Sequence, residues 1–470
     1  MGYVRGVERQ QGSLFPTAIE DLVPADHPVR VIDAFVAQLA LGELGFDRAL
    51  PKETGRPGYD PADLLKLYIY GYLHRVRTSR RLEQESQRNV EVMWLVNRLS
   101  PDFKTIADFR RDNGEPLKRV CAAFVQFCRQ AQLFSGERVA IDGSKFAGQN
   151  ARDRNYSEAQ LQKRLLQTEE KIARYLRELD EQDAQQVGVT LDPEHTAAAL
   201  QALSAQRAQI ERWLAQLAER GESQVSVTDA DARKMRTGQG EWVIGYNVQV
   251  AVDSEAHLVV HHEVTQQGND RQQLAPMAEQ TQAVLATAAL EVLADTGYSN
   301  AEAALKCEAM GITTYVPREH SVNHHGPFFD KRAFVYDPHR DSYRCPAGEH
   351  LSFRGQSAEG QRSYRSSACG GCALKAQCTA AAQRTVTRHV HERALEAMDA
   401  RARHHPQLMR QRKAIVEHPF GTLKWLLDGG RLLTHGLKSV ATEMALAILA
   451  YNLRRVLNMQ GTSWMLAALR

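Results

Sequence analysis

Two short apolar segments in the middle of this chain each lead directly into an aspartate, and this pairing constrains the fold more than any other feature. Residues 138–141 precede Asp142, and residues 291–294 precede Asp295. Short runs of β-branched and other apolar residues are typical of buried strands. If the two strands lie side by side in one sheet, their carboxylates meet at one edge. The sequence therefore predicts an acidic pair that is held in place by a sheet.

The segments between and after these strands predict the type of sheet. Apolar residues alternate over residues 243–252 and continue over 257–264, which predicts two strands joined by a short turn. Helical spacing follows over 271–289 and again over 300–310, and residues 312–316 are strand-like. This succession of strands and helices is that of an RNase H-like mixed sheet with helices, a fold of the α/β class.

The rest of the chain predicts an all-α domain and two insertions. With 470 residues the chain is long enough for two or three domains. We expect a helical N-terminal domain over residues 1–134 and the sheet-containing domain over 135–470. Residues 157–220 are charged with heptad-like apolar spacing, which predicts a helical-hairpin insertion. Residues 320–384 form a second, Cys-rich insertion.

The cysteines of the second insertion predict a structural metal site. Cys369 and Cys372 form a CxxC pair, and Cys345 and Cys378 flank it among glycines and other small residues. Four thiolates of this kind are typical ligands of structural Zn²⁺, so we expect a zinc-ribbon-like insertion. The total of seven cysteines is odd, which argues against a disulfide framework.

The apolar segments and the net charge of the chain bear on its location in the cell and on its partners. The strongest apolar run, over residues 444–453, is too short to span a bilayer, and the first residues lack a signal-peptide pattern. We therefore expect a cytoplasmic protein with no membrane partner. The formal net charge of +3 permits a nucleic-acid partner but does not indicate one by itself.

A third acidic residue completes a candidate metal site. Glu417 lies in a mainly helical segment, and Lys424 follows two turns later on the same face if the helix continues. Pro419 should kink or restart that helix. Carboxylates are suitable ligands for two Mg²⁺ or Mn²⁺ ions about 3.5–4 Å apart, the arrangement used in phosphoryl transfer. The candidate catalytic and metal-binding residues are Asp142, Asp295 and Glu417.

Basic residues gather in two places and are candidates for contact with DNA phosphates. One group follows residue 74, where we expect a single helix to carry it, and the other surrounds Glu417. For either group by itself, a solvated helix face is the favoured interpretation. The candidate DNA-binding residues are Arg75, Arg77, Arg80, Arg81, Arg410, Arg412, Lys413 and Lys424.

Six short segments spread along the chain carry a resemblance to a known family. They are residues 24–28 (PADHP), 55–61 (GRPGYDP), 139–144 (VAIDGS), 245–249 (GYNVQ), 293–298 (LADTGY) and 416–424 (VEHPFGTLK). In these segments the chain resembles the DDE-class transposases of bacterial insertion sequences. The last two segments are the most specific, because they supply the second aspartate and the glutamate of the family's acidic triad.

The resemblance implies a metal-dependent enzyme that cuts DNA at the ends of an insertion sequence and joins the exposed 3′-hydroxyl to target DNA. It implies Asp142, Asp295 and Glu417 as the metal ligands and Lys424 as a cation that contacts DNA. Arg410 and Lys413 stand where the family usually has tyrosine and arginine, which is a departure from its pattern. The implied partners are double-stranded DNA, as terminal inverted repeats and as target, and a second copy of the chain in synapsis. The N-terminal domain, residues 1–134, is then the candidate for recognising the element ends.

Two alternatives stay open at the level of sequence. A transposase-derived DNA-binding protein without catalytic activity could share the fold, although the presence of all three acids argues against it. A general RNase H-fold nuclease would act on any nucleic acid, and the helical N-terminal domain suits binding to specific ends better.

Overall fold

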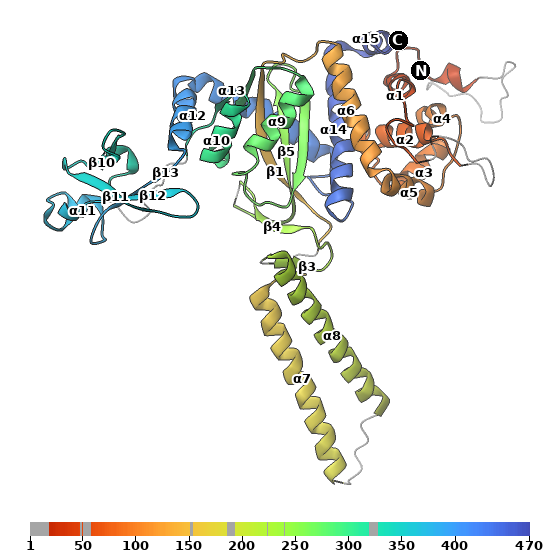
Figure 1. Cartoon of the computed structure of the whole chain (residues 1–470). Coiled ribbons are helices and arrows are strands. Elements are labelled where there is room, and N and C mark those ends of the chain that lie inside the picture. Colours follow the sequence, from red (N-terminus) through yellow and green to blue (C-terminus); the bar gives the residue numbers. More distant parts are fainter. Residues whose placement is uncertain are drawn as a thin grey trace, which may run out of the picture.

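The sheet predicted around the two aspartates is present in the computed structural model of the chain, which has a mixed α/β fold (Figure 1). β1 (Arg138–Ala147) pairs with the antiparallel β5 (Trp242–Asp253) on one edge and with the parallel β7 (Leu290–Leu293) on the other. The remaining strands are β8 (Ile312–Tyr315), parallel to β7, and β4 (Arg233–Arg236) and β6 (Val259–Thr265), which both pair with β5. The structure describes residues 18–47, 49, 58–150, 154–185, 193–222, 224–238, 240–318 and 328–470.

Helices cover both faces of this sheet because the side chains of β1 alternate between two apolar cores. Val139 and Ile141 belong to one core, whereas Ala140 and Phe146 belong to the other. The first core is shared with α9 (Leu274–Leu285), α10 (Ala301–Ala309) and α12 (Glu392–His404), and the second with α13 (Pro406–Leu426) and α14 (Leu437–Gln460). Since Asp142 follows the alternation of Ala140, it lies on the α13 side of the sheet.

The helix α14 joins the sheet to the N-terminal helices. It contacts β6 on one side and α2 and α6 on the other, and it is buried along most of its length (Figure 1). The described residues before the sheet form η1 (Ile19–Leu22), α1 (Pro28–Ala37), α2 (Pro61–Leu73), α3 (Ser79–Arg88), α4 (Val90–Leu95), α5 (Phe103–Asp112) and α6 (Gly114–Gln130). In the described ranges, neither α14 nor any other helix is long and apolar enough to cross a bilayer.

The helix α13 corrects the expectation of a break at Pro419. It runs as one helix from Pro406 to Leu426 with Pro419 inside it. Proline has no N–H to donate to the preceding turn, which costs about 3 kcal/mol in a helix interior. Burial of Pro419 itself together with Ile415, Phe420 and Leu423 offsets this cost, because the helix is held against the sheet.

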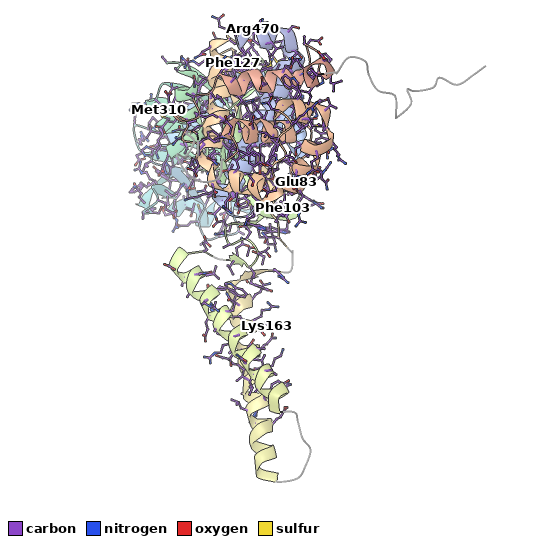
Figure 2. All side chains as sticks on the ribbon, turned by 90° about the vertical axis from the view of Figure 1, so that its right-hand side faces the viewer. Glu83, Phe103, Phe127, Lys163, Met310 and Arg470 are labelled. Carbon is purple, nitrogen blue, oxygen red and sulfur yellow. The ribbon has the colours of Figure 1, made fainter. Side chains whose placement is uncertain are left out.

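The helical hairpin forms an arm that projects from the body of the molecule. α7 (Glu158–Gln185) and α8 (Pro193–Arg220) lie side by side, and the strands β2 (Asn155–Ser157) and β3 (Gln224–Ser226) pair at their base. Figure 2 shows this arm, with Lys163 on it, extending away from the part that carries Glu83 and Phe103. A small apolar cluster around Leu161, Ile210 and Leu217 holds the base of the arm together.

The Cys-rich insertion contains its own sheet, which the sequence did not predict. The strands run antiparallel in the order β13-β12-β11-β10-β9, to one side of the central sheet (Figure 1). Their bounds are β9 (Val335–Asp337), β10 (Ser342–Arg344), β11 (His350–Gln356), β12 (Gln361–Arg365) and β13 (Thr385–His389). The short elements are η3 (Lys331–Ala333), η4 (Ser367–Gly371) and α11 (Lys375–Cys378), and α15 (Thr462–Ala468) follows α14. Most of the predicted start of this insertion, residues 319–327, lies outside the described residues.

Candidate functional site

The structure brings Asp142 and Asp295 together on neighbouring parallel strands. β1 and β7 pair with Ala140 opposite Leu293, and each aspartate lies two residues further along its chain. The charge of Asp295 raises the pKa of Asp142, so the two carboxylates are close enough to interact. The prediction that both aspartates end their strands is wrong for Asp142, because β1 continues to Ala147 and Asp142 pairs with Val250 inside it, whereas Asp295 follows the end of β7. Pairing of the two strands nevertheless brings the acidic residues to neighbouring positions.

The surroundings of Asp142 combine burial with one cation. Burial is the main cause that raises its pKa, to about 6, and the Arg412 guanidinium opposes this rise. Arg412 Nη1 lies 3.3 Å from Asp142 Oδ2, and the Gly143 backbone N–H donates to Asp142 Oδ1 at 2.8 Å. Asp295 caps the short 3₁₀ helix η2 (Thr296–Tyr298), where its Oδ1 accepts from the Gly297 N–H at 2.8 Å. Asp142 is therefore contacted at both of its oxygens, and Asp295 is anchored through its Oδ1.

A buried polar network supports this pair from the other face of the sheet. Asp270 Oδ1 accepts from Asn247 Nδ2 at 2.7 Å and from Gln249 Nε2 at 2.6 Å, and Lys145 Nζ lies 3.4 Å from the same carboxylate. The Tyr298 hydroxyl donates to Gln249 Oε1. The network thus connects β1, β5 and the turn that follows Asp295. Asp270 also raises the pKa of Asp142, which places it near the pair without a direct contact.

Gly143 is required at its position because the network fills the space beside it. A Cβ atom there would lie 2.3 Å from Gln249 Nε2 and 2.8 Å from Asp270 Oδ1. The sequence interpretation missed this network, although a signal was present. Asn247 and Gln249 occupy alternate positions of a strand that is buried on both faces, where apolar residues are the norm.

Glu417 lies on the outward face of α13, away from the two aspartates. Its side chain is 63% exposed and its Oε1 lies 3.5 Å from Lys413 Nζ, one turn earlier. The face of α13 that points to the sheet carries Arg412, Val416 and Leu423 instead. Within the described ranges, no three Asp, Glu, His or Cys side chains are arranged to hold one metal ion. The structure therefore assembles two of the three predicted ligands, and Glu417 stays a prediction.

The basic residues that follow α2 do not lie on one helix, which corrects the sequence interpretation. α2 ends at Leu73, and Thr78 caps α3, so Arg75 and Arg77 lie in the connecting segment. Arg77 is 3% exposed, and its guanidinium contacts Asp428 at 2.7 Å and Glu443 at 3.2 Å. The prediction that Arg77 contacts DNA is therefore wrong, because its charge is neutralised inside the fold.

The other predicted DNA-binding residues lie at the surface or in partly buried positions. Arg75 pairs with Asp428 at 2.5 Å, and Arg80 stacks on Phe103, 5.2 Å from the ring centroid. The exposed ones are Arg80 and Arg81 on α3 and Arg410, Lys413 and Lys424 on α13. Arg412 is the exception on α13, because it contacts Asp142.

The four cysteines of the insertion line one small cavity of about 30 Å³. Burial raises the pKa of the Cys378 thiol, and the thiols of Cys345, Cys369 and Cys372 contribute to this rise. The four cysteines therefore line one cavity, but no three of them within the described ranges are arranged to hold one metal ion, and the zinc site stays a prediction. By contrast, Cys121, Cys128 and Cys307 are buried in the apolar cores.

Comparison with known proteins identifies two parts of the chain. Residues 17–112 match the family model described as a transposase domain (DUF772), and residues 344–457 match that of a transposase DDE domain. A search of curated proteins finds no match. A solved piggyBac transposase synaptic complex with hairpin DNA shares 8% identity over 94% of this chain and 79% of that chain. Its TM-score of 0.33 is too low to support an argument. On the two domain matches, which cover the N-terminal helices and the segment with Glu417 and Lys424, this chain belongs to the DDE-class transposases.

Proposed function

We propose that this transposase cleaves DNA strands at the ends of its insertion sequence and transfers the exposed 3′-hydroxyl to target DNA with two Mg²⁺ or Mn²⁺ ions. The observation that carries the proposal is the pairing of Asp142 and Asp295 on adjacent parallel strands. The strand order β6-β5-β1-β7-β8, with only β5 antiparallel to β1 among its neighbours, supports an RNase H-like sheet.

The residues around the pair fit divalent cations. Two carboxylates lie together and Asp142 is held at a raised pKa, so its charge is not fully compensated by Arg412. Oxygen ligands of this kind suit Mg²⁺ and Mn²⁺. When bound, such ions polarise the phosphodiester and lower the pKa of water or of the 3′-hydroxyl.

The chain itself supplies position and charge. Backbone N–H groups fix one oxygen of Asp142 and one of Asp295, so both carboxylates keep a constant place, and the second oxygen of Asp142 faces Arg412. Arg412 lies at the edge of the pair, where its guanidinium is placed to meet a phosphate. Lys413, Lys424 and Arg410 on the outward face of α13 are proposed to hold the flanking DNA backbone.

Glu417 is proposed as the third ligand, and its outward position sets a condition on this role. Because it lies on the opposite side of α13 from Arg412, α13 must turn or shift when DNA and metal bind. The same position favours the second candidate function, a DNA-binding protein that does not cleave. A nicking assay separates the two, and a random-sequence duplex in that assay tests for a general nuclease.

The proposed reaction is tested by removing one carboxylate charge at a time. Asp142→Asn and Asp295→Asn should reduce nicking of an end-containing duplex at least about 1,000-fold in Mg²⁺ or Mn²⁺, because each removes a metal ligand. Affinity for the same duplex in EDTA should change less than about threefold, since the ligands serve the reaction. The matched control, Glu43→Gln, changes an exposed carboxylate in a turn before α2 and should leave nicking intact. Nicking at the wild-type rate by either aspartate variant would remove the acidic pair from the mechanism.

Two further assignments accompany this proposal. Two copies of the chain are proposed to hold the two element ends together. Light scattering tests this by measuring the mass of the complex with end DNA. Cys345, Cys369, Cys372 and Cys378 are proposed to bind one structural Zn²⁺ in a ribbon-like insertion, because their thiols line one cavity.

A further inference from the structure

A cavity lies on the outward side of α13, and none of the proposed metal ligands or DNA-binding cations lines it. It has a volume of about 430 Å³ and lies between the second half of α13 and the last turns of α14. This size is within the range of small-ligand sites. Its wall is formed by His418, Gly421, Thr422, Trp425, Tyr451, Arg454, Arg455 and Asn458. We refer to it as the Trp425 pocket.

Aromatic rings form a well-supported wall of the Trp425 pocket. Trp425 is 46% exposed, so part of its indole faces the pocket. The Arg454 guanidinium stacks on its ring at 4.8 Å from the centroid, and Arg75 stacks on it at 4.7 Å. The Tyr451 hydroxyl is held by the His257 carbonyl at 2.6 Å and lies 3.2 Å from His418 Nδ1. The rings are therefore positioned before any ligand binds.

The Trp425 pocket is positively charged. Within the described residues, neither Arg454 nor Arg455 forms an ion pair with a carboxylate, and no acidic side chain lines the pocket. Arg455 Nε donates to the Ala256 carbonyl at 2.9 Å, which leaves the rest of its guanidinium for another acceptor. The neighbouring carboxylates of α13 and the turn after it, Glu417 and Asp428, pair with Lys413 and with Arg75 and Arg77.

The position of the pocket connects it to the proposed reaction. Gly421 lies four residues after Glu417, one turn along the same outward face of α13. A DNA backbone held by Lys413 and Lys424 on this outward face would therefore continue over the Trp425 pocket. The combination of cations and a partly exposed indole suits a nucleotide. Its phosphate is anionic, and its sugar offers an apolar surface.

We propose that the Trp425 pocket binds one nucleotide of the element-end DNA, with its phosphodiester on Arg454 and Arg455 and its sugar against the exposed part of Trp425. This assignment rests on the proposed function, since it names a DNA contact on α13, the helix that carries the proposed third ligand. It also gives α14 a role in substrate binding, in addition to its packing against the sheet.

Uncharged phosphate analogues test this contact one position at a time. The probe is a duplex of the terminal repeat that flanks the chain's own coding sequence, with single phosphates replaced in turn by methylphosphonate. For the wild-type chain, replacement at one position near the cleaved bond should weaken binding about 10-fold, as expected for loss of a charge-assisted contact. For Arg454→Gln the same replacement should cost less than about twofold, because its partner is already absent. The slope of log affinity against log salt should also fall by about 1.

Two further variants keep the test decisive. Arg129→Gln removes an exposed arginine from α6, so it has the same charge change and should keep the 10-fold sensitivity. Arg455→Gln gives a second measurement if Arg454→Gln melts at a lower temperature than the wild type. The proposal is overturned if both pocket variants keep the wild-type pattern of sensitive phosphates. If the sensitive position appears but the wild type fails to nick in Mn²⁺, the pocket stands and the proposed reaction fails.

Discussion

At the scale of single residues, Asp142 is the carboxyl group of the candidate site whose pKa is shifted most clearly by its surroundings. Burial raises its pKa to about 6, and the charges of Asp295 and Asp270 add to this effect while Arg412 opposes it. A carboxyl group with a raised pKa is held in the fold at a cost to stability, since the folded chain disfavours its ionised form. Such a group is a candidate for binding a cation, because the cation would remove that cost.

This cost predicts a pH dependence of stability. The folded pKa of Asp142 lies above its ordinary value of 3.8, so the folded chain keeps a proton that the unfolded chain has released. Stability contributed by this group is therefore present below about pH 4, falls as the pH rises towards about 6, and stays low above it. Asp142→Asn lacks this titration. In EDTA, its free energy of unfolding relative to the wild type should rise by about 1–3 kcal/mol between pH 4 and pH 7.

Urea unfolding at several pH values measures that difference. Glu43→Gln serves as the control, because its exposed carboxylate should give a difference that is the same at both ends of the range. A constant difference for Asp142→Asn would mean that the group titrates normally in the folded chain.

At the scale of elements, the segment between α2 and α3 acts as a clamp on the C-terminal helices. Arg77 contacts Glu443 of α14 and Asp428 at the end of α13, and Glu443 is fully buried. Glu443 also accepts from the backbone N–H groups of Leu433 and Thr434, at 2.9 Å each. The clamp therefore joins the DUF772 region to the DDE region through buried charge.

Removing the cation of this clamp should destabilise the chain. Arg77→Met leaves Glu443 buried without its cation, which typically costs about 3–5 kcal/mol. Arg80→Gln removes an exposed arginine from the same region and should change stability by less than about 0.5 kcal/mol. Urea unfolding of both variants checks this, and equal stability would show that Arg77 does not have a structural role.

The positions of the site residues on their strands and helices could be predicted from the sequence only in part. That Asp142 and Asp295 lie near each other was predictable, because the two strands pair in parallel, although β1 extends past Asp142 to Ala147 instead of ending there. The position of Glu417 was not, since the sequence does not determine which face of a helix packs on the sheet when a proline interrupts the pattern. The contacts of Asp270 with Asn247 and Gln249 could not be predicted either, because they depend on tertiary packing.

At the scale of the whole molecule, the parts with separate apolar cores are the parts inserted into the central fold. The Cys-rich insertion packs around Tyr343, Leu351 and Tyr364, and the arm has its own small cluster around Leu161. The core of the N-terminal helices, by contrast, is continuous with the core on the α13 side of the sheet. A core as small as that of the insertion provides little stability by itself, so a bound metal ion would add to its free energy of folding.

Metal content of the purified chain tests this last point. We expect about one zinc per chain, measured by elemental analysis after dialysis against trace zinc, with none in Cys369→Ser/Cys372→Ser. Cys307→Ala is the matched control, because Cys307 lies in a different core and should not change the zinc content. A wild-type chain without zinc, with all seven thiols reduced, would contradict the assignment.

In the proposed reaction, Asp142, Asp295 and Glu417 share divalent cations when DNA is bound. The most direct measurement is the anomalous scattering of Mn²⁺ in crystals of the chain with its element-end duplex. We expect manganese peaks between the carboxylates of Asp142 and Asp295, with Glu417 turned inward as a further ligand. Manganese bound elsewhere, or Glu417 still on the outward face beside Lys413 in the DNA complex, would contradict this expectation.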